Sequence, residues 1–150
     1  MVSAALVRTQ TRAGAAALAE VSRDAQRDAA LLLCHVLGKN RAWMLANPEH
    51  ELSVDQIGTY NALVARRAQH EPMQYILGEQ EFYGLRFRVT PAVLIPRPET
   101  EHLVEAVLAR VSREKPLRIA DVGTGSGAIA VALARHLPLA SIDALSLIHI

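Results

Sequence analysis

The run Asp121-Val122-Gly123-Thr124-Gly125-Ser126-Gly127 has residue types and spacing that suit a ligand-binding corner. An apolar segment precedes it, and a helix-forming segment begins at Ala128. Glycine at alternate positions allows a sharp turn and removes the β-carbons that would hold a ligand away. The peptide N–H groups and the positive end of the following helix are then expected to face the ligand. The sequence therefore predicts a nucleotide-type cofactor site at the edge of a parallel sheet.

The chemistry of this corner favours one cofactor over another. Residues 123–128 formally fit the dinucleotide pattern G-x-G-x-x-A, which is a weak signal by itself. Asp121 stands two residues before the first glycine, where a carboxylate would repel a pyrophosphate but tolerate the cationic end of S-adenosylmethionine. Gly127 adds a third alternate glycine, which lets the backbone close on the methionine moiety. S-adenosylmethionine is thus preferred to NAD, and a tight strand-to-helix turn without a ligand is the remaining alternative.

The elements that must position this corner form a strand–helix–strand unit. We expect a strand at 117–122, a helix at about 128–136 and a second strand from about residue 140, with Pro138 between helix and strand. A unit of this length predicts a parallel strand pair.

The segment 95–101, Ile-Pro-Arg-Pro-Glu-Thr-Glu, holds Arg97 extended between two prolines before a helix that starts at Pro98 or Thr100. This segment is either a stiff connector to a helix N-terminus or a lip of the cofactor pocket. In the second interpretation Arg97, Glu99 and Thr100 lie near the ligand.

Residues 1 to about 77 are predicted to be helical only. Five helices are expected: 4–20; a helix capped by Ser22 that runs to Leu37, with Gly38 in the left-handed turn; 41–46, capped by Asn40; a helix from the Ser53–Gln56 capping box to about Gln69; and a short helix from Pro72 to Gly78. In the fourth helix, the apolar stripe comprises Val54, Ile57, Tyr60, Leu63 and Val64. The bundle is interpreted as a recognition or packing module. After it, residues 79–97 change to strand periodicity, and a hairpin that turns at Gly84 is predicted.

The composition sets broader bounds. With 51% hydrophobic and 21% charged residues and a net charge of +1, the 150-residue chain is expected to be a soluble folded protein without a general basic field for nucleic acid. The single Cys34 excludes an intrachain disulfide and fits a reducing compartment; a buried helix thiol is preferred to a reactive one. The histidines at 35, 50 and 70 lack metal-ligand spacing. No signal peptide and no run of 18 apolar residues is found, which argues against secretion and membrane spanning.

Four motifs together resemble a known family: 72–78 (Pro-Met-Gln-Tyr-Ile-Leu-Gly), 81–84 (Glu-Phe-Tyr-Gly), 95–101 and 121–127. Their order and spacing over about residues 20–144 resemble the peptide chain release factor (glutamine-N5) methyltransferases, also called the HemK or PrmC family. The resemblance implies methyl transfer from S-adenosylmethionine to the glutamine side-chain amide of the Gly-Gly-Gln motif in class I release factors. It also implies that the protein is a cytoplasmic monomer. The residues implied to bind the cofactor are Asp121, Gly123, Thr124, Gly125, Ser126 and Gly127.

The fold that the resemblance implies is α/β, in three parts. Residues 1–77 are expected to form a helical release-factor-recognition domain and residues 78–97 a β-hairpin linker. Residues 98–150 are expected to be the incomplete start of a class I, Rossmann-like methyltransferase domain. Residues 145–150, Leu-Ser-Leu-Ile-His-Ile, resemble translated sequencing-adapter sequence and are expected to be a non-native tail.

The sequence also departs from the family. The Asn-Pro-Pro-Tyr motif that holds the substrate amide in the family does not occur in the 150 residues, and no catalytic residue is assigned. An acidic partner for the cofactor ribose is expected near position 146, where the chain has Ser146; Asp143 is offset by three residues and is not given that role. The chain as given is therefore expected not to turn over and not to bind S-adenosylmethionine tightly.

Three alternatives remain at this level. A DNA adenine-N6 methyltransferase also methylates a conjugated amino nitrogen, but the near-neutral charge argues against it. A dinucleotide-dependent oxidoreductase is disfavoured by Asp121 and by the helical region before it. The third alternative is a docking module without catalysis, in which residues 1–77 bind the release factor.

Overall fold

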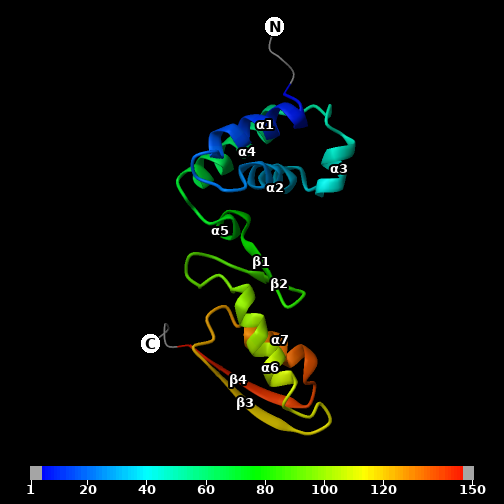
Figure 1. Cartoon of the computed structure of the whole chain (residues 1–150), viewed down its shortest axis with the longest axis vertical. Coiled ribbons are helices and arrows are strands. Elements are labelled where there is room, and N and C mark those ends of the chain that lie inside the picture. The colour runs from blue at the N-terminus through cyan, green and yellow to red at the C-terminus, as the bar shows by residue number, and fades with distance from the viewer. Residues whose placement is uncertain (1–4, 147–150) are drawn as a thin grey trace. The chain divides into compact units, whose positions relative to one another are not determined.

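Helical spacing of the apolar residues ends near Leu77, and the chain folds into a separate unit on each side of that point (Figure 1). The computed structural model describes residues 5–146. The two compact units are Met1–Leu77 and Gly78–Ile150. Each has its own cluster of buried apolar side chains, so each half of the sequence builds its own core.

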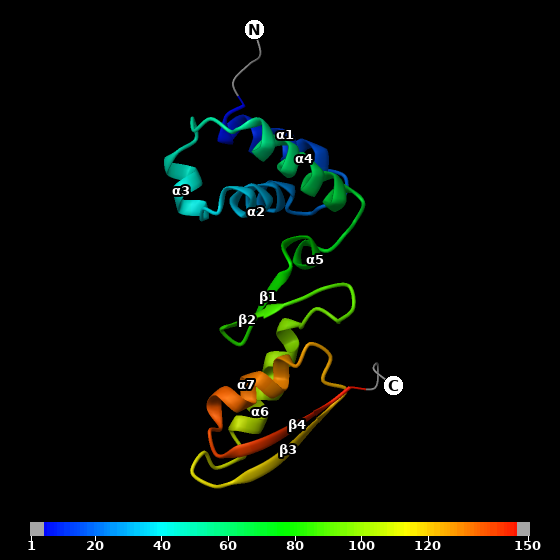
Figure 2. The same cartoon turned by 180° about the vertical axis from the view of Figure 1, so that it is seen from behind.

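The first unit is a helical bundle. Its helices are α1 (Val7–Leu18), α2 (Ala25–Leu37), α3 (Arg41–Ala46), α4 (Val54–Ala68) and α5 (Met73–Leu77). Helices α1, α2 and α4 pack against one another, α3 packs on α2, and α5 packs on α2 and α4 (Figures 1 and 2). The five predicted helices are thereby confirmed, with α1 and α2 slightly shorter than predicted.

Local sequence signals set most of the helix ends. The Asn40 side chain accepts a hydrogen bond from the backbone N–H of Trp43 over 2.8 Å, and Ser53 and Gln56 form the predicted capping box of α4. Gly38 ends α2 with a φ of +61°, in the left-handed region that favours glycine. These predictions are confirmed.

The predicted cap of α2 is wrong. Asp24, not Ser22, is the N-cap, and its carboxylate accepts a hydrogen bond from the backbone N–H of Arg27. The Ser22 hydroxyl is engaged elsewhere, because it donates to Asp28 over 2.8 Å and accepts from the N–H of Asp24. Ser22 therefore organises the turn before the helix, and the helix begins later than predicted.

The core of the first unit uses most of the predicted stripe on α4. Tyr60 and Val64 are buried, and Ile57 and Leu63 pack against the cluster. Val54 is 84% exposed, so its predicted place in the stripe is wrong. Each step of three residues turns the helix by about 300°, which is about 60° short of a full turn. The two steps from Val54 to Tyr60 therefore place these side chains about 120° apart around the helix.

The second unit begins with a hairpin. Strands β1 (Glu79–Phe82) and β2 (Leu85–Arg88) are antiparallel, which confirms the hairpin predicted in this region. Tyr83 and Gly84 between them both have positive φ, as in the type I′ turns that suit hairpins. Phe82 and Phe87 are buried in the core of the second unit and meet edge to face, with ring centroids 6.2 Å apart. The hairpin thus contributes to that core.

The rest of the second unit is a strand–helix–strand arrangement preceded by a helix. A short 3₁₀ turn, η1 (Pro98–Thr100), leads into α6 (Glu101–Leu108) and is followed by β3 (Leu117–Val122), α7 (Ala128–His136) and β4 (Ala140–Leu145). Strands β3 and β4 pair in parallel, from Leu117 opposite Ala140 to Val122 opposite Leu145, as predicted. Helices α6 and α7 lie on one face of this strand pair (Figures 1 and 2). The fold is therefore a helical region followed by a small α/β unit.

Two expectations concern the ends of the chain and its environment. Of the tail expected to be non-native, Leu145 and Ser146 are described, and residues 147–150 lie outside the described residues. Between residues 5 and 146, none of the helices has the length and apolar character that a membrane crossing requires.

Candidate cofactor site

The glycine loop joins the end of β3 to the start of α7. Gly123, Gly125 and Gly127 have φ values of +82°, +56° and +77°. Residues with a β-carbon are strained in this region, so the backbone of the loop requires glycine at these alternate positions. A β-carbon added at any of the three would meet no described atom within 4 Å. The space beside the loop is therefore open, as the predicted ligand requires.

Asp121 lies at the end of β3 on the face that points toward the helices, and it is half-buried. The hydroxyl of Thr124 donates a hydrogen bond to Oδ2 of Asp121 over 2.8 Å. Among the described residues, no side chain or backbone group donates to the other oxygen, Oδ1. The loop thus fixes the orientation of the carboxylate and leaves one oxygen for a ligand.

The peptide N–H groups of the loop are arranged differently from the prediction. Those of Gly123 and Thr124 both donate to the carbonyl oxygen of Leu145, over 2.8 and 3.0 Å, and that of Gly127 donates to the carbonyl of Thr124. The expectation that these groups face a ligand is therefore wrong for these three residues. The first two join the loop to the end of β4, because the parallel pairing brings Leu145 beside Val122.

The donor and acceptor set fits one of the two predicted cofactors better. A pyrophosphate is usually bound by several free N–H groups in such a loop, and here three of them are already occupied. A cationic amino or sulfonium group is attracted by a carboxylate, and Asp121 presents one beside an open, glycine-lined space. The corner is thus chemically suited to S-adenosylmethionine.

The Ile-Pro-Arg-Pro-Glu-Thr-Glu segment forms the entry to α6. Pro96 is buried, Arg97 and Glu99 are exposed, and residues 98–100 form the 3₁₀ turn. Within residues 5–146, no hydrogen bond or ion pair joins Arg97, Glu99 or Thr100 to the glycine loop. The observed contacts support the interpretation as a stiff helix entry.

Glu101, the last residue of that segment, has a role that sequence reasoning missed. Its Oε1 accepts a hydrogen bond from the backbone N–H of Tyr83 over 2.9 Å, which links α6 to the turn of the hairpin. Tyr83 has a positive φ, so this contact stabilises a backbone conformation that is unusual for tyrosine. The spacing of the motif carries no signal for this partner.

Other candidate chemical groups have structural partners. Asp143 is exposed and pairs with Arg118 over 3.3 Å across the parallel strands. Burial raises the pKa of the Cys34 thiol, which lies 3.0 Å from the sulfur of Met44, and this favours the interpretation as a structural thiol. In the part of the chain that the structure describes, no three His, Cys, Asp or Glu side chains gather to hold a metal ion.

Comparisons with known proteins cover both units. Residues 11–78 match the family described as the PrmC N-terminal domain. The chain is 52% identical over 127 residues to the release factor glutamine methyltransferase of Coxiella burnetii, a match that covers 85% of this chain and 46% of the relative. It is 51% identical over 119 residues to the protein of that name from Koribacter versatilis, which covers 79% and 42% of the two chains.

The protein of the same name from Escherichia coli K12 is 48% identical over 119 residues, or 79% of this chain and 43% of the relative. The chain thus spans less than half the length of the curated relatives it matches. The predicted resemblance to the release factor glutamine methyltransferases is confirmed by the match of residues 11–78 to the PrmC N-terminal domain and by the identity to these relatives.

Proposed function

We propose that this chain is part of an enzyme that methylates the side-chain N5 of glutamine in the Gly-Gly-Gln motif of class I peptide chain release factors. The observation that carries the proposal is about 50% identity to curated release factor glutamine methyltransferases over most of the chain. At such identity the glycine loop and the helical domain are expected to retain the family's roles. The protein acts in the cytoplasm as a monomer, and nucleic acid is not its substrate.

S-adenosylmethionine is the proposed methyl donor. Asp121, with its orientation fixed by Thr124, holds the positive amino acid end of the cofactor, and Gly123, Gly125, Ser126 and Gly127 form the wall beside it. When bound, the cofactor supplies an electrophilic methyl group. The residues of this chain bind and orient that group, and the unit that contains them is the start of a class I, Rossmann-like methyltransferase domain.

The acceptor side of the reaction has its own requirement. The nitrogen of a side-chain amide is a poor nucleophile because its lone pair is delocalised into the carbonyl. An enzyme must hold it in line with the methyl group and accept its N–H hydrogens as charge develops. In the family that we infer, an Asn-Pro-Pro-Tyr motif does this, and the motif does not occur in the 150 residues. We therefore assign cofactor binding and substrate recognition to this chain, and amide binding to a further part of the protein.

The proposed division of labour follows the chain. Residues 1–77 engage the release factor, residues 78–97 connect the helical region to the catalytic part, and residues 98–150 begin the methyltransferase domain. The two compact units divide at residues 77 and 78, which is compatible with this assignment.

A chimera tests the proposal. Residues 5–144 of this chain are joined to the C-terminal part of the Coxiella burnetii relative, which is 52% identical in the shared region. The chimera is incubated with S-adenosylmethionine and a purified class I release factor, and the tryptic peptide with the Gly-Gly-Gln motif is examined by mass spectrometry. The expected result is one added methyl group on the glutamine side chain.

Two controls define the result. The intact relative shows that the release factor preparation is competent, and double-stranded DNA offered in place of the release factor tests the adenine-methylating alternative. A folded chimera that methylates DNA, or that leaves the glutamine unmodified while the intact relative modifies it, contradicts the proposed function.

A further inference from the structure

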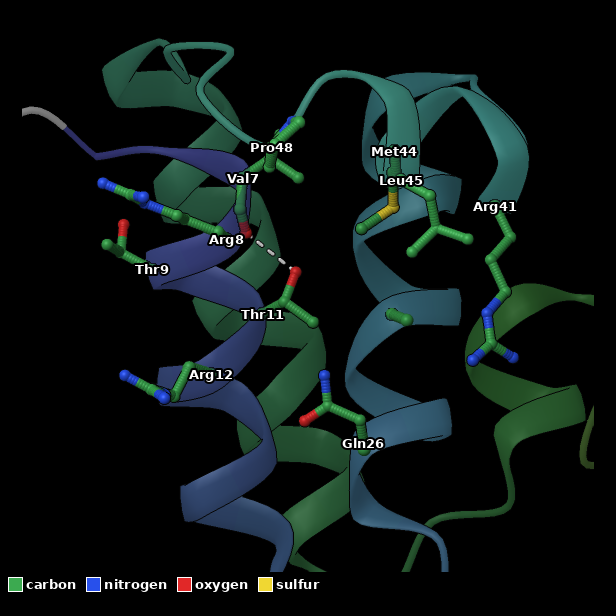
Figure 3. Close-up of a pocket in the computed structure, with 11 residues that line it drawn as sticks. Val7, Arg8, Thr9, Thr11, Arg12, Gln26, Arg41, Met44, Leu45 and Pro48 are labelled. Atoms are coloured by element: carbon green, nitrogen blue, oxygen red, sulfur yellow. Dashed lines mark hydrogen bonds between the residues drawn. The ribbon is translucent and has the colours of Figure 1, made fainter.

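A groove on the helical unit is separate from the glycine loop. It lies between α1, α2 and α3, has a volume of about 750 Å³, and is bordered by the connection from α3 to α4 (Figure 3). Its floor is apolar and includes Ala30 and Met44, which are buried. Leu45 and Pro48 complete it, and Leu45 is 74% exposed. The Leu45 side chain therefore adds exposed apolar surface to the groove, next to the buried Met44.

The rim of the groove is positively charged. Arg8 and Arg12 lie one helical turn apart on α1, and Arg41 lies on α3; Figure 3 shows them on opposite sides of the apolar floor. Arg8 pairs with the exposed carboxylate of Glu49 over 2.6 Å. Neither Arg12 nor Arg41 forms an ion pair with any carboxylate among residues 5–146. Two guanidinium groups therefore face solvent without the neutralising partner that surface arginines often have.

Polar side chains between the two sides narrow the ligand class. The Thr11 hydroxyl donates to the carbonyl of Val7 over 2.8 Å and is already satisfied. The Gln26 amide extends into the space between α1 and α2 (Figure 3) and has both a donor and an acceptor. The groove thus combines an apolar floor, two unpaired cations and an amide that can bind a peptide backbone.

We propose that this groove binds an acidic segment of a protein partner, with an apolar side chain of the segment seated on Leu45 and Met44. Carboxylates of the segment pair with Arg12 and Arg41, because guanidinium groups match carboxylates in charge and geometry. The inference rests on the proposed function in one respect: the partner that carries the segment is the release factor. It adds a docking site that is distinct from the glycine loop.

The features of the groove favour a protein over a nucleic acid. None of the described side chains that line it is aromatic, so it offers no ring on which a base could stack. The chain has a net charge of only +1, so it lacks the extended basic surface that binds a phosphate backbone. The exposed Leu45 is suited to an apolar side chain.

The test uses the 150-residue chain and three fluorescent probes. The probes are a labelled class I release factor, a short helical peptide of glutamate, alanine and leucine with glutamates one turn apart, and a single-stranded RNA. Binding is measured by fluorescence anisotropy for the chain and for the double variant Arg12→Ala/Arg41→Ala. The control is Arg23→Ala/Arg27→Ala, which removes the same charge from exposed positions outside the groove. Trp43 fluorescence shows that each variant is folded.

We expect Arg12→Ala/Arg41→Ala to weaken binding of the release factor and of the acidic peptide about tenfold, since two guanidinium–carboxylate contacts are lost. The control should stay within about twofold of the original chain, and a peptide with glutamine in place of glutamate should bind weakly. Leu45→Ser should weaken binding of the release factor and of the acidic peptide without changing the charge of the chain.

The outcomes separate the groove from the proposed function. If Arg12→Ala/Arg41→Ala leaves release factor binding unaffected, the groove is not the docking site, and the proposed function is left intact. Binding of the acidic peptide that depends on both arginines, without release factor binding, supports the groove and contradicts the proposed partner. Binding of the RNA alone, or of no probe, overturns the inference.

Discussion

The hydroxyl of Thr124 donates a hydrogen bond to the carboxylate of Asp121 over 2.8 Å, across the first glycine of the loop. This contact orients the carboxylate at the point where β3 ends and the open space beside the glycines begins. A charged acceptor makes such a hydrogen bond stronger than a neutral one. The glycine loop therefore orients Asp121, the carboxylate that we propose to bind the cofactor.

The negative charge of Asp121 should contribute more to the affinity for S-adenosylmethionine than its hydrogen bond to Thr124 does. In the chimera described above, Asp121→Asn keeps an acceptor for the hydroxyl but removes the negative charge, and we expect S-adenosylmethionine to bind at least about tenfold more weakly. Thr124→Val leaves the charge and should weaken binding only about threefold. Isothermal titration measures both. Equal affinities for the original chimera and Asp121→Asn would show that the carboxylate does not contact the cofactor.

Substitution by alanine should change the free energy of unfolding in opposite directions at two helical glycines. A β-carbon at Gly14 in α1 would lie 2.0 Å from the Tyr60 hydroxyl and 2.9 Å from its ring, whereas one at Gly58 in α4 meets nothing within 4 Å. Gly14→Ala should lower the free energy of unfolding by about 2 kcal/mol through overpacking. Gly58→Ala should raise it by about 0.5–1 kcal/mol, because alanine favours the helix. Urea unfolding followed by the fluorescence of Trp43, the chain's one tryptophan, measures both. A stabilising Gly14→Ala would disprove the packing of α1 on Tyr60.

Alkaline pH should destabilise the helical unit through Tyr60. Burial raises the pKa of this phenol to about 12, from about 10 when it is exposed, and its hydroxyl donates to the carbonyl of Ala29. The unfolded chain therefore releases the Tyr60 proton at lower pH than the folded chain. The contribution of Tyr60 to the free energy of unfolding is complete below pH 10 and falls by about 2–3 kcal/mol as the pH rises to about 12.

The variant Tyr60→Phe isolates this effect, because phenylalanine keeps the ring and cannot ionise. Urea unfolding of both proteins at a series of pH values should show curves that converge above pH 10, with the loss of stability confined to the original chain. Parallel curves between pH 10 and 12 would mean that the phenol is not buried in solution.

Neighbouring arginines on α4 should differ in their contribution to stability. Arg67 pairs with Asp28 on α2 over 2.8 Å, and the two side chains are only 18% and 13% exposed. Arg66 pairs with Glu71 at a more exposed position, with 43% of the Arg66 side chain accessible. Arg67→Ala should lower the free energy of unfolding by about 2–3 kcal/mol, since it leaves a largely buried carboxylate without its cation, whereas Arg66→Ala should cost about 0.5 kcal/mol.

Urea unfolding curves of these two variants give the comparison directly. Because the substitutions are adjacent on one helix and remove the same charge, helix propensity and net charge cancel. Equal losses for both variants would indicate that the Asp28 carboxylate is hydrated in solution.

Several elements could be predicted from residues close together in the chain. Asn40 before α3, the Ser53–Gln56 pair before α4 and Gly38 after α2 act within one turn of the helix end that they define. The hairpin turn and the strand–loop–helix at 117–136 follow from similarly local signals. The prediction for Ser22 is wrong because two polar residues separated by one position, Ser22 and Asp24, compete for one cap, and the hydrogen bond from Ser22 to Asp28 leaves the cap to Asp24.

Neighbouring residues are sufficient to specify where most helices, turns and strands form, and their order places a carboxylate before three alternate glycines. Which side chains and backbone groups come into contact depends on packing between elements that are distant in the chain. The N–H groups of Gly123 and Thr124 are occupied because parallel pairing brings the Leu145 carbonyl to them. Arg12 and Arg41 border one groove only because α1 and α3 both pack around α2. Such partners are far apart along the chain, and packing of the apolar faces, which no local pattern specifies, sets the distance between them.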